Sequence, residues 1–126
     1  MKKVNVLGTE YSVYIANDKT CYRLKDIDGF CDTSTKEIYV NDFSCVPDDD
    51  TSRKCGNVWA IVRRVLLHEL IHAFLFESGM DANSHALCPD GWGTDEEIVD
   101  FFALQFFKIK DAFDEASGVV SEMTGE

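Results

Sequence analysis

Two histidines and a glutamate make up the motif in this sequence that most clearly could do chemistry. His68, Glu69 and His72 fit the pattern H-E-x-x-H and use two of the three histidines in the chain. Histidines four residues apart on a helix project from one face, so both imidazoles can reach one metal ion. The glutamate between them can act on a water held by that metal. The motif therefore indicates a zinc-dependent hydrolytic site.

A catalytic zinc usually takes three protein ligands and leaves a fourth position for water. One class of H-E-x-x-H peptidases has a further histidine six residues after the second, and Ser78 occupies that position here. The other main class takes a glutamate from a following helix, often with an aspartate four residues later. Glu96 and Asp100 fit that arrangement. We expect Glu96 to bind the metal and Asp100 to hydrogen-bond the free ring nitrogen of a ligating histidine.

Three other residues compete for roles at this site. Glu97 is the rival ligand, but Thr94 and Glu97 have the spacing of a capping box, which accounts for Glu97 without a metal. His85 lies in the connecting loop, where it is either an exposed side chain, a catalytic donor to the developing oxyanion, or a replacement for Glu96 as a ligand. Cys88, in the same loop, could also coordinate the metal.

The elements that must position these residues follow from hydrophobic spacing and turn residues. Residues 1–45 contain alternating apolar positions, including Tyr22 and Leu24 and most clearly residues 37–40, which predicts a small antiparallel sheet of three or four strands. A helix is expected over about residues 57–78, with Asn57 as its N-cap and Gly79 as its stop. The motif histidines lie on its apolar stripe, so we expect them to face the core.

The second half of the site requires another helix, expected over about residues 95–110. Residues 116–126 are acidic and weakly patterned, and we expect them to be frayed or disordered. The sequence therefore predicts one α+β domain over residues 1–115, with the sheet packed on both helices and a tail behind it.

Composition limits the classes of partner. The chain has 126 residues, 45% of them apolar, and a net charge of −11. The charge argues against nucleic acid as a partner, and no stretch approaches the length of a membrane span. The first residues lack the pattern of a signal peptide, so we expect a cytoplasmic protein. Five cysteines without a C-x-x-C pair favour reduced thiols.

The two motifs resemble a known class of enzymes. Residues 65–79, VLLHELIHAFLFESG, resemble gluzincin-type zinc metallopeptidases, and more closely a group of short metallopeptidases carried by phages and mobile elements of Gram-positive bacteria. Residues 96–105, EEIVDFFALQ, are similar to the second motif of that group, and the resemblance covers about residues 30–110. It implies a minimal zincin-like fold, Zn²⁺ between two helices, and a protein or peptide substrate in the cytoplasm of a bacterial host.

The expected reaction is hydrolysis of a peptide bond by a water that zinc activates. Glu69 would take the proton and pass it to the leaving amine, and His85 or Tyr39 would stabilise the tetrahedral intermediate. We also expect residues 37–40 to form an edge strand that pairs with the substrate. The alternative is a structural or regulatory zinc protein without turnover. Its zinc would be coordinated by four protein ligands, which leaves no position for water. The oligomeric state stays open.

Overall fold

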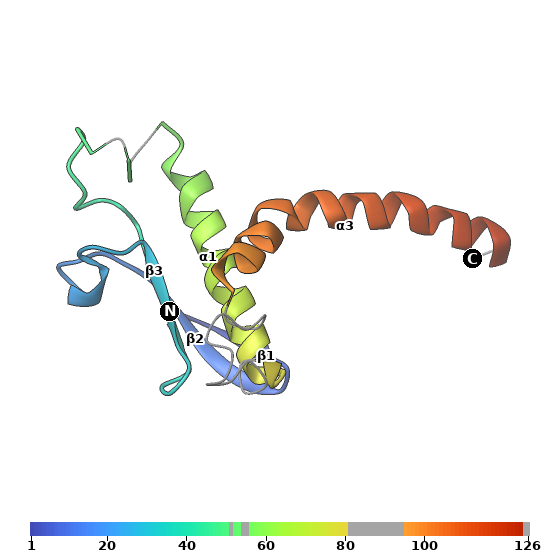
Figure 1. The fold of residues 1–126 in the computed structure, drawn as a ribbon, viewed down its shortest axis with the longest axis horizontal. Coiled ribbons are helices and arrows are strands. Elements are labelled where there is room, and N and C mark those ends of the chain that lie inside the picture. Colours follow the sequence, from blue (N-terminus) through green and yellow to red (C-terminus); the bar gives the residue numbers. More distant parts are fainter. Residues whose placement is uncertain (51, 54–55, 81–94, 125–126) are drawn as a thin grey trace.

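The computed structural model of the chain describes all residues except 51, 54–55, 81–94 and 125–126. It has a four-stranded sheet, one long helix packed on the sheet, and a second long helix that crosses the first and then leaves the body (Figure 1). The expected α+β class is therefore confirmed. The elements in chain order are β1 (Lys2–Val6), β2 (Thr9–Ala16), the 3-10 helix η1 (Tyr22–Leu24), β3 (Gly29–Asp32), β4 (Glu37–Asn41), α1 (Val58–Glu77) and α3 (Glu96–Thr124).

The sheet is mixed, so the prediction of an antiparallel sheet was wrong for one of its strand pairs. Its order is β1-β2-β4-β3, with antiparallel pairs β1–β2 and β3–β4 and a parallel pair β2–β4. After β2 the chain passes through η1 and β3 before it returns as β4, and this long crossover lets β4 enter alongside β2 in the same direction. Alternating apolar residues define the buried face of a strand but not the direction of its neighbour.

Two further strand predictions were wrong. Tyr22 and Leu24 belong to a 3-10 helix, in which the backbone N–H groups of Leu24 and Lys25 donate to the carbonyl oxygens three residues earlier. β4, expected at an edge, lies between β2 and β3. Among the described strands, β3 is instead the edge strand that lies beside the H-E-x-x-H motif of α1.

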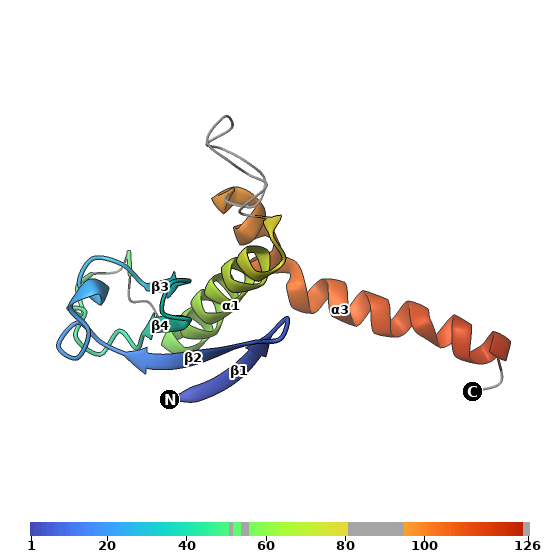
Figure 2. The ribbon, with the colours of Figure 1, turned by 90° about the horizontal axis from the view of Figure 1, so that it is seen from below.

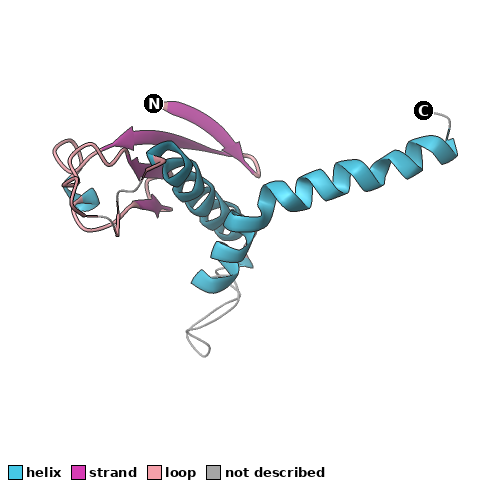
Figure 3. Ribbon diagram, turned by 90° about the horizontal axis from the view of Figure 1, so that it is seen from above, coloured by secondary structure: helices cyan, strands magenta, loops and turns pink. Residues whose placement is uncertain are grey.

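Helix α1 covers one face of the sheet (Figures 2 and 3). Asn57 caps its first turn by accepting a hydrogen bond from the backbone N–H of Ala60, and Gly79 follows its last turn with a φ of 87°, both as expected. The core between helix and sheet consists of apolar side chains from the two layers. It includes Val6, Tyr11, Val13, Ile38, Val40, Phe43, Val46, Val62, Val65 and Ala73.

The last turn of α1 is tied to the sheet by one carboxylate. Glu77 accepts hydrogen bonds from Lys36 Nζ and Tyr11 OH, each at 2.7 Å, and from Thr9 Oγ1 at 3.2 Å. The hydrogen bond from Lys36, followed by that from Tyr11, holds the pKa of Glu77 below its usual value. This anchor fixes the axis of the helix that carries the motif.

Helix α3 is longer than the sequence predicted. It runs to Thr124, so residues 116–124 continue the helix and do not form the frayed tail that we expected. No proline follows Pro89 in the sequence, and Lys110 Nζ pairs with Asp114 one turn later at 2.6 Å, so nothing ends the helix near residue 110. Within the described residues, no helix is both long and apolar enough to cross a membrane.

Candidate metal centre

Helix α1 presents its motif with the glutamate inward. The buried positions of α1 are Val62, Val65, Glu69 and Ala73, which follow one another at helical spacing on the face toward the sheet. The side chains of His68 and His72 lie at the margin of that face, with exposed fractions of 20% and 21%. The prediction that the histidines face the core was therefore wrong. They border it, and they turn toward α3.

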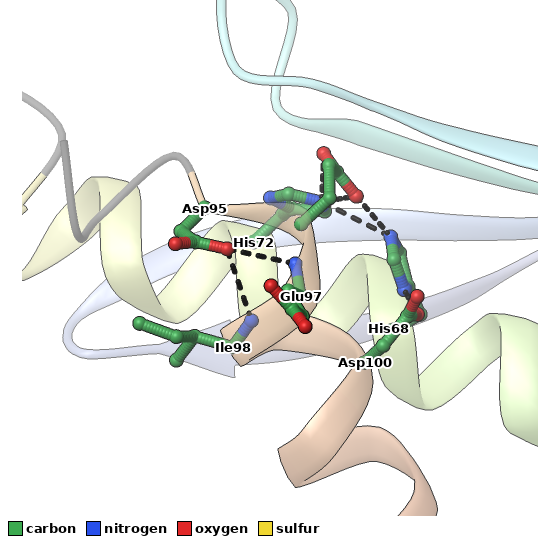
Figure 4. A network of polar contacts seen from close by, with 7 residues as sticks. His68, His72, Asp95, Glu97, Ile98 and Asp100 are labelled. Carbon is green, nitrogen blue, oxygen red and sulfur yellow. Dashed lines mark hydrogen bonds and ion pairs between the residues drawn. The ribbon is translucent and has the colours of Figure 1, made fainter. Parts of the chain in front are cut away.

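The first turn of α3 meets the two histidines. Asp95 caps this helix, because its Oδ1 accepts hydrogen bonds from the backbone N–H groups of Glu97 and Ile98 (Figure 4). That cap starts the helix at Glu96 and places Asp100 one turn further along the same side. Both carboxylates thereby reach α1.

The side chains meet at close range. The Glu96 carboxylate lies 3.0 Å from His68 Nε2 and 3.1 Å from His72 Nε2, and the two Nε2 atoms are 3.1 Å apart. Ligand atoms about 2.0–2.1 Å from a zinc ion are separated by roughly 3.3 Å in a tetrahedron. His68, His72 and Glu96 thus form a group that could hold a metal ion.

Asp100 contacts one of the two motif histidines. Its Oδ1 lies 2.7 Å from Nδ1 of His68, and Figure 4 shows the two side chains facing each other. A neutral imidazole that donates its Nδ1–H to a carboxylate keeps the lone pair on Nε2, which is the atom that faces Glu96 and His72. This pairing is the one that the sequence led us to expect.

Glu97 is placed differently from Glu96, but the capping-box role that we predicted for Glu97 is not the reason. Thr94, the expected N-cap, lies outside the described residues, and Asp95 acts as the cap. Glu97 is therefore the second residue of the helix and not the third, so the capping-box argument does not apply. The metal-holding group found among the described residues contains Glu96 and not Glu97.

Glu69 lies beneath the histidines, against the sheet. Only 8% of Glu69 is exposed, and this burial raises the pKa of its carboxyl group, while the nearby His68 and His72 lower it. Gly29, at the start of β3, packs against this side chain. A Cβ built on Gly29 would lie 2.7 Å from Val65 Cγ1 and 3.4 Å from Glu69 Cγ, so only glycine lets β3 approach this closely.

Gly29 is the residue of this site that the sequence analysis missed. A glycine at the start of a strand is a signal of close approach by another element, and that signal was present in the sequence.

An open groove of about 490 Å³ gives access to the metal-holding group. Its walls come from the edge strand β3 and the turn after it on one side, and from the two helices on the other. They comprise Gly29, Phe30, Cys31, Thr33, His68, Glu69, His72 and Glu96. A molecule in this groove would contact the edge strand and the motif at the same time.

Tyr39, one of the two residues expected to stabilise the intermediate, lies elsewhere. Its neighbours Ile38 and Val40 are buried under α1, so Tyr39 points to the opposite face of the sheet, where its ring stacks on Tyr14 and Phe30. Burial raises the pKa of its hydroxyl.

The loop candidates lie outside the described residues. His85 and Cys88 fall within residues 81–94, and Cys55 is also outside the described part of the chain. The described cysteines, Cys21, Cys31 and Cys45, are thiols.

Comparison of the chain with protein-family models, with curated proteins and with solved structures gave no match. The assignment of a function therefore depends on the site itself.

Proposed function

We propose that this protein is a zinc-dependent metallopeptidase of the gluzincin type, acting on proteins or peptides in the cytoplasm. The observation that carries the proposal is the position of the Glu96 carboxylate, which lies within 3.1 Å of the Nε2 atoms of both motif histidines. Two imidazoles and a carboxylate are the ligand set of catalytic zinc sites that keep a place for water. Zn²⁺ bound there would polarise a water molecule and the carbonyl of a peptide bond.

The residues around the ligands have separable tasks in this proposal. Asp100 holds His68 in the tautomer that offers Nε2 to the metal. Glu69 does not belong to the ligand group, and it lies in the wall of the groove, where its carboxylate can take a proton from water and deliver it to the leaving amine. Burial raises the pKa of Glu69, and a raised pKa suits a group that accepts and then returns a proton.

The groove supports an extended peptide as the substrate. β3 is the edge of the sheet among the described strands and forms one wall of the groove, so a peptide could lie alongside it and pass the metal-holding group. A second cavity, of about 220 Å³, adjoins Glu69 and is lined by Arg64, Val65 and Asp100 among others. It would take a side chain next to the cleaved bond.

The test is cleavage of a mixed peptide library by protein that has been stripped of metal and reloaded with zinc. We expect cleavage to require zinc and to fall by at least about 10²-fold in Glu69→Gln, which removes the proton acceptor and leaves the ligands in place. Zinc bound equally by both proteins, with no cleavage by either, would instead support the structural or regulatory alternative. Equal cleavage by Glu69→Gln would contradict the proposed mechanism.

A further inference from the structure

Helix α3 carries an apolar stripe that stays exposed among the residues that the structure describes. From the point where α3 leaves the body (Figure 1), large apolar side chains remain in solvent. The exposed fraction rises along one stripe, from 38% at Phe102 to 69% at Phe113. Val99, three residues before Phe102, has the same spacing and is buried, so the stripe continues the face of α3 that packs toward α1. At 100° per residue, Glu96 and Asp100 lie roughly 110° and 150° from the centre of the stripe, so the candidate metal site and the stripe occupy different faces of the helix.

The spacing of the stripe is that of a coiled coil. Phe102, Phe106, Ile109 and Phe113 are separated by four, three and four residues, the alternation that brings a and d positions to one seam. In the sequence, Ala116, Val120 and Met123 continue the same spacing to the end of α3. A helix with this repeat can pack against a second helix of the same kind, knobs into holes.

The charges on α3 are distributed in a way that suits a second copy of this chain. With a net charge of −11, two copies should repel each other unless the contact avoids acidic residues. The positions that flank the seam, Gln105, Lys110, Ala112 and Ser117, include no acid. The acids of this segment, Asp111, Asp114 and Glu115, fall on the remaining faces of the helix.

The one charge beside the seam is also compensated. Lys110 Nζ lies 2.6 Å from Asp114 of its own helix. The positive charge of Lys110 is therefore already paired in each copy, and the two lysines need not repel each other across the seam. A membrane surface rich in anionic lipids fits less well, because the other faces of the helix would bring carboxylates to it.

We propose that the chain forms a homodimer through α3, with the stripe Phe102, Phe106, Ile109 and Phe113 as the seam. The apolar surface that each copy contributes is on the order of 300 Å², judged from the size of aromatic side chains. This is below the roughly 800 Å² per partner of a standard interface. The dimer should therefore be weak, and its population should depend on concentration.

Sedimentation equilibrium of the full chain over about 1–300 µM tests the proposal. We expect the mass to rise from 14.2 kDa toward twice that value. Phe113→Asp should stay monomeric throughout, whereas Phe113→Leu should retain the dimer. Lys108→Asp, which makes a larger charge change away from the seam, is the matched control and should also dimerise.

Circular dichroism establishes that each variant is folded, and Ile109→Asp provides a second seam variant if Phe113→Asp is not. A wild-type chain that stays at 14.2 kDa over the whole concentration range would overturn the proposal. The stripe would then bind a partner other than a second copy of the chain. Dimers of equal affinity in wild type, Phe113→Asp and Ile109→Asp would overturn it as well, because association would then occur elsewhere.

Discussion

Asp100 Oδ1 lies 2.7 Å from Nδ1 of His68, a contact that joins α3 to the first motif histidine of α1 across 32 positions of sequence. The contact orients the imidazole. It also makes the geometry of the ligand group depend on how the two helices pack.

Removal of this carboxylate should weaken metal binding without abolishing it. We expect Asp100→Ala to lower zinc affinity by about 10–100-fold, and Asp100→Asn to lower it less, because the amide oxygen can still accept from Nδ1–H. Competition with a chromophoric chelator measures the affinity. Asp111→Ala, an exposed acid further along the same helix, is the control and should bind zinc like the wild type. Unchanged affinity in Asp100→Ala would show that Asp100 does not orient His68.

A methyl group at Gly29 should disturb both stability and the site. Its Cβ would lie 2.7 Å from Val65 Cγ1 and 2.9 Å from the Tyr39 carbonyl oxygen, so β3 or α1 must move. We expect Gly29→Ala to lower the free energy of unfolding by about 1–3 kcal/mol in urea titrations, and to reduce any turnover further by displacing Glu69. Gly56→Ala meets nothing within 4 Å and is the matched control. Wild-type stability in Gly29→Ala would mean that β3 does not lie this close to α1.

The anchor at Glu77 should make stability depend on pH. Its pKa is lowered in the folded protein from the ordinary value of 4.5, so its stabilising effect is present above that value and is lost as pH falls through the lowered pKa. Glu77→Gln should therefore unfold at a lower temperature than the wild type at pH 7, and the two melting temperatures should converge in acid.

Thermal melts of the two proteins between pH 7 and pH 3 measure this difference. Glu10→Gln alters an exposed ion pair with Lys3 and should change the melting temperature little at any pH. A difference in melting temperature between wild type and Glu77→Gln that stays constant with pH would exclude the ionised carboxylate as the cause of that difference.

The residues of the candidate site could be placed from the sequence because helical spacing converts directly into a shared face. The four-residue steps from His68 to His72 and from Glu96 to Asp100 each describe one turn of a helix, and the structure brings these four side chains together. The inward position of Glu69 was not predicted. The apolar stripe of α1 is broad, and only the packed sheet decides which of its positions is covered.

The fold could be predicted by class but not by topology. Alternation in β1, β2 and β4 identifies strands and their buried side chains, whereas the parallel pairing of β2 with β4 depends on contacts between distant segments. The error at Glu37–Asn41 has the same origin, since no local pattern tells an edge strand from an inner one. At Thr94 and Asp95 two residues compatible with an N-cap are adjacent, and Asp95 is the one that caps α3.

The most direct test of the metal site is the zinc content of the purified chain, compared with Glu96→Ala and Glu97→Ala after reconstitution. Both variants lose one acid from the first turn of α3, so effects on the helix terminus cancel. We predict about one zinc per chain in the wild type and in Glu97→Ala, and a severe loss in Glu96→Ala. Full zinc binding by Glu96→Ala, or no metal in the reconstituted wild type, would contradict the account.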